Sequence, residues 1–160
     1  MKMPVLLVYG NTAGGLASSA FGFSNTASGD NANAFGYNNI ASGSKSNVFG
    51  TGNTVSGSSS TAVGTANEVA AENSTAIGNN NTISSSAENS AALGNNISIS
   101  LKDSVALGNN STATAINSVT GNSSYTKWAG VSDVVGVVSV GSSGATRQIQ
   151  NVAAGQVSAT

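Results

Sequence analysis

The sequence of 160 residues contains no cysteine and no histidine, and it has only one arginine and one proline. Without cysteine there is no disulfide framework, no thiol nucleophile and no cysteine-ligated zinc site. Without histidine, a Ser-His-Asp arrangement and a histidine general base are both excluded. We therefore expect neither an enzyme nor a protein that carries a cofactor or a metal.

Charge is also scarce, with five Lys and Arg, six Asp and Glu, and a formal net charge of −1. The cations are scattered along the chain, whereas a nucleic-acid surface needs them clustered, so we expect no nucleic-acid partner. The longest aliphatic run, residues 5–8, is far too short to span a bilayer. Nothing resembles a signal peptide, so we expect any targeting segment to lie outside this chain.

Small polar residues dominate instead: 28 Ser, 21 Asn, 20 Gly and 14 Thr. A disordered linker can share this composition, but it has no reason to keep a register. Here the motif Ser-x-Ala-φ-Gly, in which φ is a large apolar residue, recurs from Ser18 to Gly108. Its glycine returns at every fourteenth position, except that two more residues intervene between Gly78 and Gly94. We therefore interpret the chain as a folded repeat protein.

Three positions of the motif are nearly constant. The Ala position holds Ala20, Ala34, Val48, Ala62, Ala76, Ala92 and Ala106. The φ position holds Phe21, Phe35, Phe49, Val63, Ile77, Leu93 and Leu107. The glycines are Gly22, Gly36, Gly50, Gly64, Gly78, Gly94 and Gly108. A second apolar position lies five places after each glycine, and asparagine holds the third place after the glycine in five repeats.

A repeat of this length is too short for a pair of helices, and Ser, Asn, Gly and Thr are poor helix formers. The length fits two short strands and two tight turns, so each repeat is predicted to be one coil of a parallel β-solenoid. Successive coils would stack at about 4.8 Å, with Asn over Asn and Ser over Ser. The two extra residues are expected to form a bulged corner around Ser84 to Ala87.

Strand alternation places Ala and Gly on one face and φ on the other. The near-constant Ala indicates the tighter space inside a narrow roll. A row of seven large apolar side chains cannot comfortably face water, so this assignment predicts self-association as a closed homo-oligomer. The opposite assignment, with φ inside, predicts an oligomer less strongly.

The repeat fades after Ala115, and a β-rich run over residues 131–140 follows. We interpret residues 121–160 as a terminal cap or connector that does not continue the solenoid, because the open end of a solenoid must be covered. Residues 1–9 do not fit the coil, although Ala13 and Gly15 match half of one. We therefore divide the chain into an N-terminal cap or expression remnant over 1–15, repeats over 16–120, and the C-terminal segment.

The coils at Asn73-Ser-Thr-Ala-Ile-Gly78 and Asp103-Ser-Val-Ala-Leu-Gly108 resemble the head repeats of trimeric autotransporter adhesins, the YadA-like head above all. Val138-Ser-Val-Gly141, together with residues 147–155, is similar to the neck that follows such heads. The resemblance implies an all-β fold, a left-handed parallel β-roll assembled as a homotrimer with a C-terminal neck. It assigns to the neck Arg147, Gln148, Ile149, Asn151, Val152 and Gly155.

The resemblance further implies a bacterial surface adhesin that attaches to extracellular-matrix proteins, cells or abiotic surfaces by multivalent contact. Because no stalk heptads and no membrane anchor occur in the sequence, we expect a head-plus-neck fragment of an outer-membrane-anchored fibre. Only Val105 gives the full Asn/Asp-Ser-Val-Ala-φ-Gly form that collagen-binding members repeat, which argues against collagen. No ligand-binding residue can be assigned.

Three alternatives remain beside the adhesin. A purely structural spacer of a surface fibre would need no ligand. A solenoid that binds ice or a crystalline carbohydrate would need a ladder of Thr-x-Thr, and only Thr112-Ala-Thr114 has that spacing. A polysaccharide-cleaving solenoid would need clustered carboxylates or basic residues, which these coils do not repeat.

Overall fold

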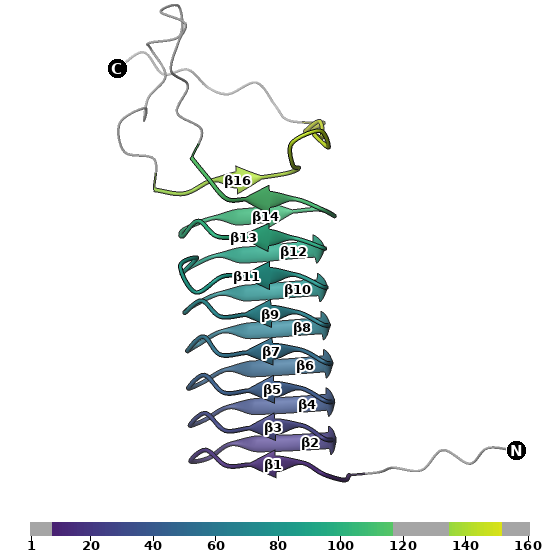
Figure 1. Cartoon of the computed structure of the whole chain (residues 1–160), viewed down its shortest axis with the longest axis vertical. Coiled ribbons are helices and arrows are strands. Elements are labelled where there is room, and N and C mark those ends of the chain that lie inside the picture. The colour runs from purple at the N-terminus through teal and green to yellow at the C-terminus, as the bar shows by residue number, and fades with distance from the viewer. Residues whose placement is uncertain (1–7, 117–134, 152–160) are drawn as a thin grey trace, which may run out of the picture.

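A computed structural model describes residues 8–116 and 135–151. The described chain winds into a stack of coils that form two parallel sheets, each of eight strands (Figure 1). The odd-numbered strands follow one another in chain order along one sheet, and the even-numbered strands do so along the other. The prediction of a parallel β-solenoid is confirmed, and no helix occurs among the described residues.

The first sheet, called the long-strand sheet here, carries the Ser-x-Ala-φ-Gly motif. Its strands are β2 (Ser19–Phe23), β4 (Asn33–Tyr37), β6 (Asn47–Thr51), β8 (Thr61–Thr65), β10 (Thr75–Asn79), β12 (Ala91–Asn95), β14 (Val105–Leu107) and β16 (Val138–Ser139). The second, the short-strand sheet, carries the second apolar position. Its strands are β1 (Thr12–Ala13), β3 (Thr26–Ala27), β5 (Ile40–Ala41), β7 (Thr54–Val55), β9 (Glu68–Val69), β11 (Thr82–Ile83), β13 (Ser98–Ile99) and β15 (Thr112–Ala113).

Equivalent residues of successive coils pair directly. Ala76 lies between Ala62 and Ala92, and Ile77 lies between Val63 and Leu93. This register keeps every buried side chain over its counterpart in the coil before, which a slip of one residue would reverse. One repeat of the motif in the sequence therefore corresponds to one coil, and so to one strand in each sheet.

Two tight corners per coil let the chain reverse within so few residues. Each corner contains a residue in the left-handed region, with φ between 53° and 60° for the residues other than glycine. Asparagine fills many of these positions, because its short polar side chain tolerates left-handed backbone better than most. The extra two residues of one coil form a turn in which the Ala87 amide donates to the Ser84 carbonyl at 2.8 Å. The insertion therefore lies where the sequence predicted it.

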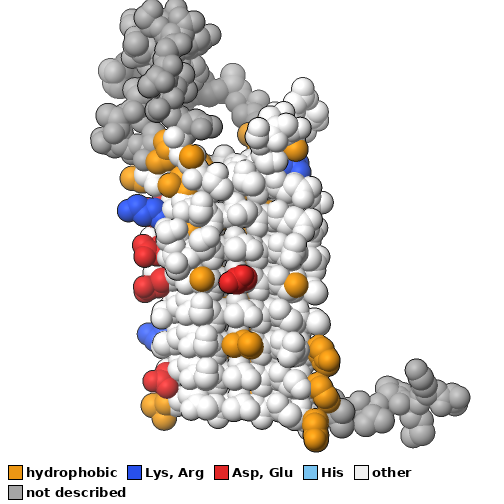
Figure 2. Space-filling view, viewed as in Figure 1, with side chains coloured by type: hydrophobic (Ala, Val, Ile, Leu, Met, Phe, Trp, Pro, Cys, Tyr) orange, Lys and Arg blue, Asp and Glu red, His pale blue; other side chains and the backbone are white. Residues whose placement is uncertain are grey.

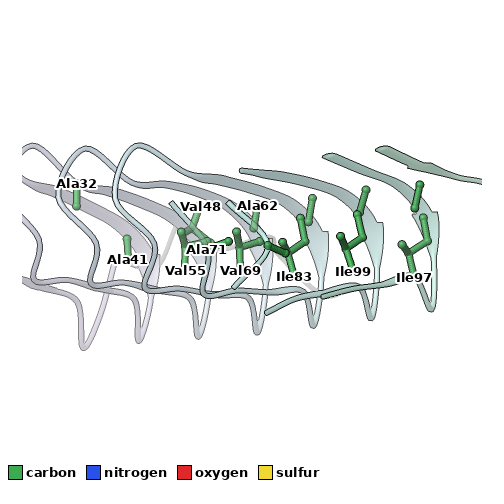
Figure 3. Packing of buried hydrophobic residues seen from close by; sticks show 14 of the residues in the cluster. Ala32, Ala41, Val48, Val55, Ala62, Val69, Ala71, Ile83, Ile97 and Ile99 are labelled. Atoms are coloured by element: carbon green, nitrogen blue, oxygen red, sulfur yellow. The ribbon is translucent and has the colours of Figure 1, made fainter. Parts of the chain in front are cut away.

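Small and branched apolar side chains lie between the two sheets in the interior of the roll (Figure 3). Six of the seven residues at the Ala position are buried, and Ala20 is partly buried at the N-terminal end. The second apolar position faces them from the short-strand sheet, with Val55, Val69 and Ile83 fully buried. Because small residues from one sheet meet larger ones from the other, the core reaches close packing with only a few side chains per coil.

A column of buried asparagines runs through one corner, and we call it the amide column: Asn25, Asn39, Asn53, Asn67 and Asn81, with Asn11 below it. In Asn53, Nδ2 donates to Asn39 Oδ1 at 3.0 Å and to the Gly64 carbonyl at 2.9 Å. Asn53 Oδ1 accepts from the backbone amide and the side-chain amide of Asn67, both at 2.9 Å. Each buried amide is thus satisfied by its neighbours along the stack.

The motif serines form a second buried column. Ser60 Oγ donates to the Ala71 carbonyl at 2.7 Å and accepts the Ser74 amide at 3.0 Å. The same acceptance recurs from Ser74 to Ser90 and onward through Ser104. Both predicted ladders, of asparagine and of serine, are therefore present and carry hydrogen bonds from coil to coil.

The motif glycines differ from the sequence expectation. They do not share the buried interior with the Ala position, because none of them is fully buried. From Gly22 to Gly94 their φ angles lie between 115° and 146°. A Cβ added to Gly64 would lie 1.9 Å from the Gly78 carbonyl oxygen of the next coil. Glycine is required by its backbone angle and by the approach of the neighbouring coil, and strand alternation alone could not indicate this.

The two ends of the solenoid also need correction. Tyr9 bridges Phe23 in parallel and β1 pairs with β3, so the coils begin before residue 16. At the other end β16 pairs with β14 in the register of the repeat. The expectation that the C-terminal segment does not continue the solenoid is therefore wrong over β16. Its Val-Ser-Val-Gly sequence follows the motif spacing, with serine in the Ala position.

Candidate assembly face

The φ residues project from the outer side of the long-strand sheet. We call them the outer apolar column: Phe21, Phe35, Phe49, Val63, Ile77, Leu93 and Leu107. Phe35 is half-buried, and the other six are between 37% and 53% exposed. Within a single chain this column is open to solvent along the whole stack. Its side chains are those that alternation placed opposite the buried Ala position.

Charged side chains are absent from the described strands of the long-strand sheet, which carries the outer apolar column. No residue of the strands β2 to β16 in the long-strand sheet is charged. Six of the described charged residues lie instead at the corner that leads from the short-strand sheet back to the long-strand sheet: Asp30, Lys45, Glu72, Glu88, Lys102 and Asp103. We call this the charged corner, and Figure 2 shows charged side chains spaced along one edge of the stack. Depletion of charge is typical of the centre of a protein interface.

Two stacks of aromatic rings lie at the N-terminal end of the same sheet. Phe35 stacks on Phe49 with ring centroids 5.3 Å apart, and Phe21 lies 6.4 Å from Phe35. The other stack comprises Tyr9, Phe23 and Tyr37, with centroids 5.7 and 5.5 Å apart, and Phe23 and Tyr37 each come one residue after a motif glycine. Figure 2 shows hydrophobic side chains gathered at this edge, where β2 and β4 end. The sequence analysis missed the second stack, although its members follow the period of the motif.

Arg147 fastens the C-terminal segment onto the last coil. Its guanidinium donates to Ser111 Oγ at 3.1 Å, to the Val140 carbonyl at 2.7 Å and to the Asn109 carbonyl. The other described residues assigned to the neck, Gln148, Ile149 and Asn151, are exposed. Val152 and Gly155 lie outside the described residues. Among the described residues of this group, Arg147 is the one that hydrogen-bonds to the repeats.

Reactive side chains stay apart in the described part of the chain. No group of three or more potential metal-ligating side chains comes together within residues 8–116 and 135–151. A shallow groove over the last coil is lined mainly by small residues such as Thr112, Ser139 and Thr146, with Arg147 at its side. That arginine donates hydrogen bonds to three neutral oxygens of the chain. In the same described part of the chain, no helix is long and apolar enough to cross a membrane.

These features define a class of protein: a parallel β-solenoid stabilised by amide and hydroxyl ladders, which displays an uncharged face with a continuous apolar column. A family comparison then specifies it, because the YadA head domain repeat matches residues 13–39, 56–81 and 102–119. This match covers a little less than half of the chain, and together with the solenoid it supports a YadA-like head of a trimeric autotransporter adhesin. No match was found among curated proteins. The family is one of adhesin-type bacterial surface domains without enzymatic activity.

Proposed function

We propose that this chain is the head of a bacterial surface adhesin, that it assembles as a parallel homotrimer, and that it attaches by multivalent contact. The observation that carries the assembly is the outer apolar column on a face without charge. Seven large apolar side chains in one line are more than a monomer of this size ordinarily leaves in water. Packing three copies of the face together would remove the column from solvent and leave the charged corners outside.

The remaining surface supports attachment through many similar contacts. Each coil presents the short-strand sheet and its corners to solvent, with Ser, Thr and Asn side chains repeated at the coil spacing. Such groups form neutral hydrogen bonds that are weak one at a time. Three chains, each with a stack of equivalent coils, would multiply them by avidity. The proposed ligands are extracellular-matrix proteins, cell surfaces or abiotic surfaces.

The assembly is tested by the mass of the purified chain in solution, measured by light scattering. We expect three times the chain mass of 15.5 kDa. Ile77 and Ile40 give a matched pair of variants, because each is 43% exposed, Ile77 on the long-strand sheet and Ile40 on the short-strand sheet. Ile77→Glu should yield monomers, because burying an unpaired carboxylate in the interface is unfavourable, while Ile40→Glu should remain trimeric.

A folded wild-type monomer, or an equal effect of the two glutamate variants, would show that the outer apolar column is not the interface. Attachment is tested separately with the trimer, by measuring its retention on immobilised matrix proteins, cells and plastic. A trimer that is retained on none of these would instead act as a spacer within a fibre.

A further inference from the structure

Translation by one coil brings the outer apolar column almost onto itself. The column follows the period of the motif with one exception, and its members are all large and apolar. If one chain of the proposed trimer slipped along the axis by one coil, φ residues would still meet φ residues. The column alone therefore favours association much more than it favours one axial register, which is a general weakness of repetitive interfaces.

The aromatic residues, unlike the outer apolar column, are not repeated along the whole axis, so they can distinguish one axial register from another. All aromatic residues of the described chain lie in its first coils, and we call them the aromatic block: Tyr9, Phe21, Phe23, Phe35, Tyr37 and Phe49. The position after the motif glycine changes along the axis. It holds Phe23 and Tyr37 near the N-terminal end, then Thr51 and Thr65, and then asparagines from Asn79 onward.

The asparagines at this position are organised as well. Asn79 Nδ2 donates to Asn95 Oδ1 at 2.7 Å, and Asn95 Nδ2 donates to Asn109 Oδ1 at 2.9 Å. The edge of the face is thus aromatic at one end and amide at the other. In a cyclic assembly of parallel chains, equal heights along the axis meet. A slip of one coil would set an aromatic ring against threonine and would leave part of the block in water.

We infer that the second aromatic stack, formed by Tyr9, Phe23 and Tyr37, sets the axial register of the assembled chains. Tyr9 and Tyr37 are 66% and 54% exposed in the single chain, so the stack can contact a neighbouring copy without rearrangement. Its rings are already stacked on one another, so little side-chain freedom is lost when a second copy packs on them. This inference rests on the proposed homotrimer.

Register can be measured by disulfide cross-linking, because the chain has no cysteine of its own. Val63→Cys and Ile77→Cys place a thiol in the outer apolar column one coil apart. Differently tagged chains that carry one or the other substitution are refolded together and oxidised. A bond between two Val63→Cys chains reports correct register and serves as the positive control. A bond between a Val63→Cys chain and an Ile77→Cys chain reports a slip of one coil, since disulfides tolerate little extra separation.

In the otherwise unchanged sequence we expect the correct-register bond to predominate strongly. The double substitution Phe23→Thr and Tyr37→Thr introduces the residue that Thr51 and Thr65 already provide at this position, so the coil should fold. It should raise the slipped bond several-fold while the mass stays trimeric. Ile40→Thr, which removes an exposed apolar side chain from the short-strand sheet, should leave the ratio unchanged.

An unchanged ratio in the double variant would overturn the inference and would place the register determinant elsewhere in the chain. Dissociation of the double variant, but not of Ile40→Thr, would also overturn it, because the stack would then supply affinity and not register. A monomeric wild-type chain would be a failure of the proposed trimer itself. Light scattering of each sample distinguishes these cases.

Discussion

At the residue scale, two kinds of glycine behave differently in this solenoid. Gly52 lies at a corner with φ of 64° and has no atom within 4 Å of the position of an added Cβ. In the next coil Ala66 takes the equivalent place with φ of 54°, so a side chain is tolerated there. Gly64, by contrast, has φ of 126° and faces the carbonyl of the next coil. The first glycine is replaceable and the second is not.

We therefore expect Gly64→Ala to destabilise the fold by about 3 kcal/mol or more, because backbone strain and an overlap with backbone atoms combine. Gly52→Ala should cost only about 1–2 kcal/mol, which is the ordinary penalty for an L-residue in left-handed backbone. Urea unfolding followed by circular dichroism measures both free energies of unfolding. Equal losses in the two variants would contradict the role assigned to the motif glycine.

The amide column shows what a single residue type contributes when it is repeated. Each asparagine donates to its own coil and to both neighbours, so the buried amides are satisfied only as a set. The column ends at Asn81, whose Oδ1 accepts the Ile97 amide at 3.0 Å. The next coil can have the apolar Ile97 at this position, because the backbone amide of Ile97 donates the hydrogen bond that Asn81 Oδ1 accepts. The regular spacing of asparagine predicted the ladder, but not the carbonyls that complete it.

At the element scale, the half-coil around β16 is joined to the repeats by strand pairing and by hydrogen bonds. The Val137 amide donates to Ser104 Oγ at 3.1 Å, and the Thr112 amide donates to the Gly141 carbonyl at 2.9 Å. Arg147 adds three bonds to this junction. Gly108 contributes by being small, since a Cβ there would lie 3.3 Å from the guanidinium. The arginine thus closes the last coil much as a cap closes a solenoid.

Replacing Arg147 with alanine should loosen this junction while the middle coils stay folded, since the bonds it makes are confined to the last coil. Hydrogen exchange should show lower protection of the Val137 and Thr112 amides and unchanged protection of the Thr61 amide. Gln148→Ala, at the exposed neighbouring residue, is the control and should change none of them. Uniform loss of protection along the stack would mean that Arg147 stabilises the whole solenoid instead.

At the scale of the whole molecule, side chains of different types lie on different parts of the stack. Among the described residues, most charged side chains lie at the charged corner, large apolar side chains line one face, and the aromatic rings lie at the N-terminal end of the stack. The inward-facing positions of the two sheets are already occupied by small and β-branched residues. The outer apolar column lies outside this filled interior, and the described residues leave most of it exposed. The proposed trimer would cover this column and would leave the polar coils for attachment.

If attachment is multivalent, removal of one coil should weaken it by degrees. Deleting residues 51–64 joins Gly50 to Thr65 in register and should shorten the stack by about 4.8 Å without unfolding it. Adhesion of this variant should fall moderately in a surface-retention assay. Deleting only residues 58–64 breaks the period and should abolish the fold, which makes it the control for register. Complete loss of adhesion after the whole-coil deletion would indicate one discrete binding site.

The sequence by itself determined the period, the strands, the corners and the fact that the Ala and φ positions lie on opposite sides of the strand. These features follow from local rules, namely alternation in a strand, the tolerance of asparagine for left-handed backbone, and identity at a fixed spacing. The insertion at Ser84 to Ala87 was predictable for the same reason, because the one longer interval between motif glycines shows which coil contains the extra residues.

Only the tertiary structure decided where residues distant in the chain meet. Gly64 is constrained by a carbonyl of the next coil, Tyr9 joins a stack that begins before the recognised repeat, and β16 pairs with β14, which lies far earlier in the sequence. Arg147 reaches Asn109, which lies 38 positions earlier. No local pattern encodes such contacts, because they depend on the stacking of coils and on where the chain re-enters the stack. These residues interact because the stacked coils bring them close together in space, although they are far apart in the sequence.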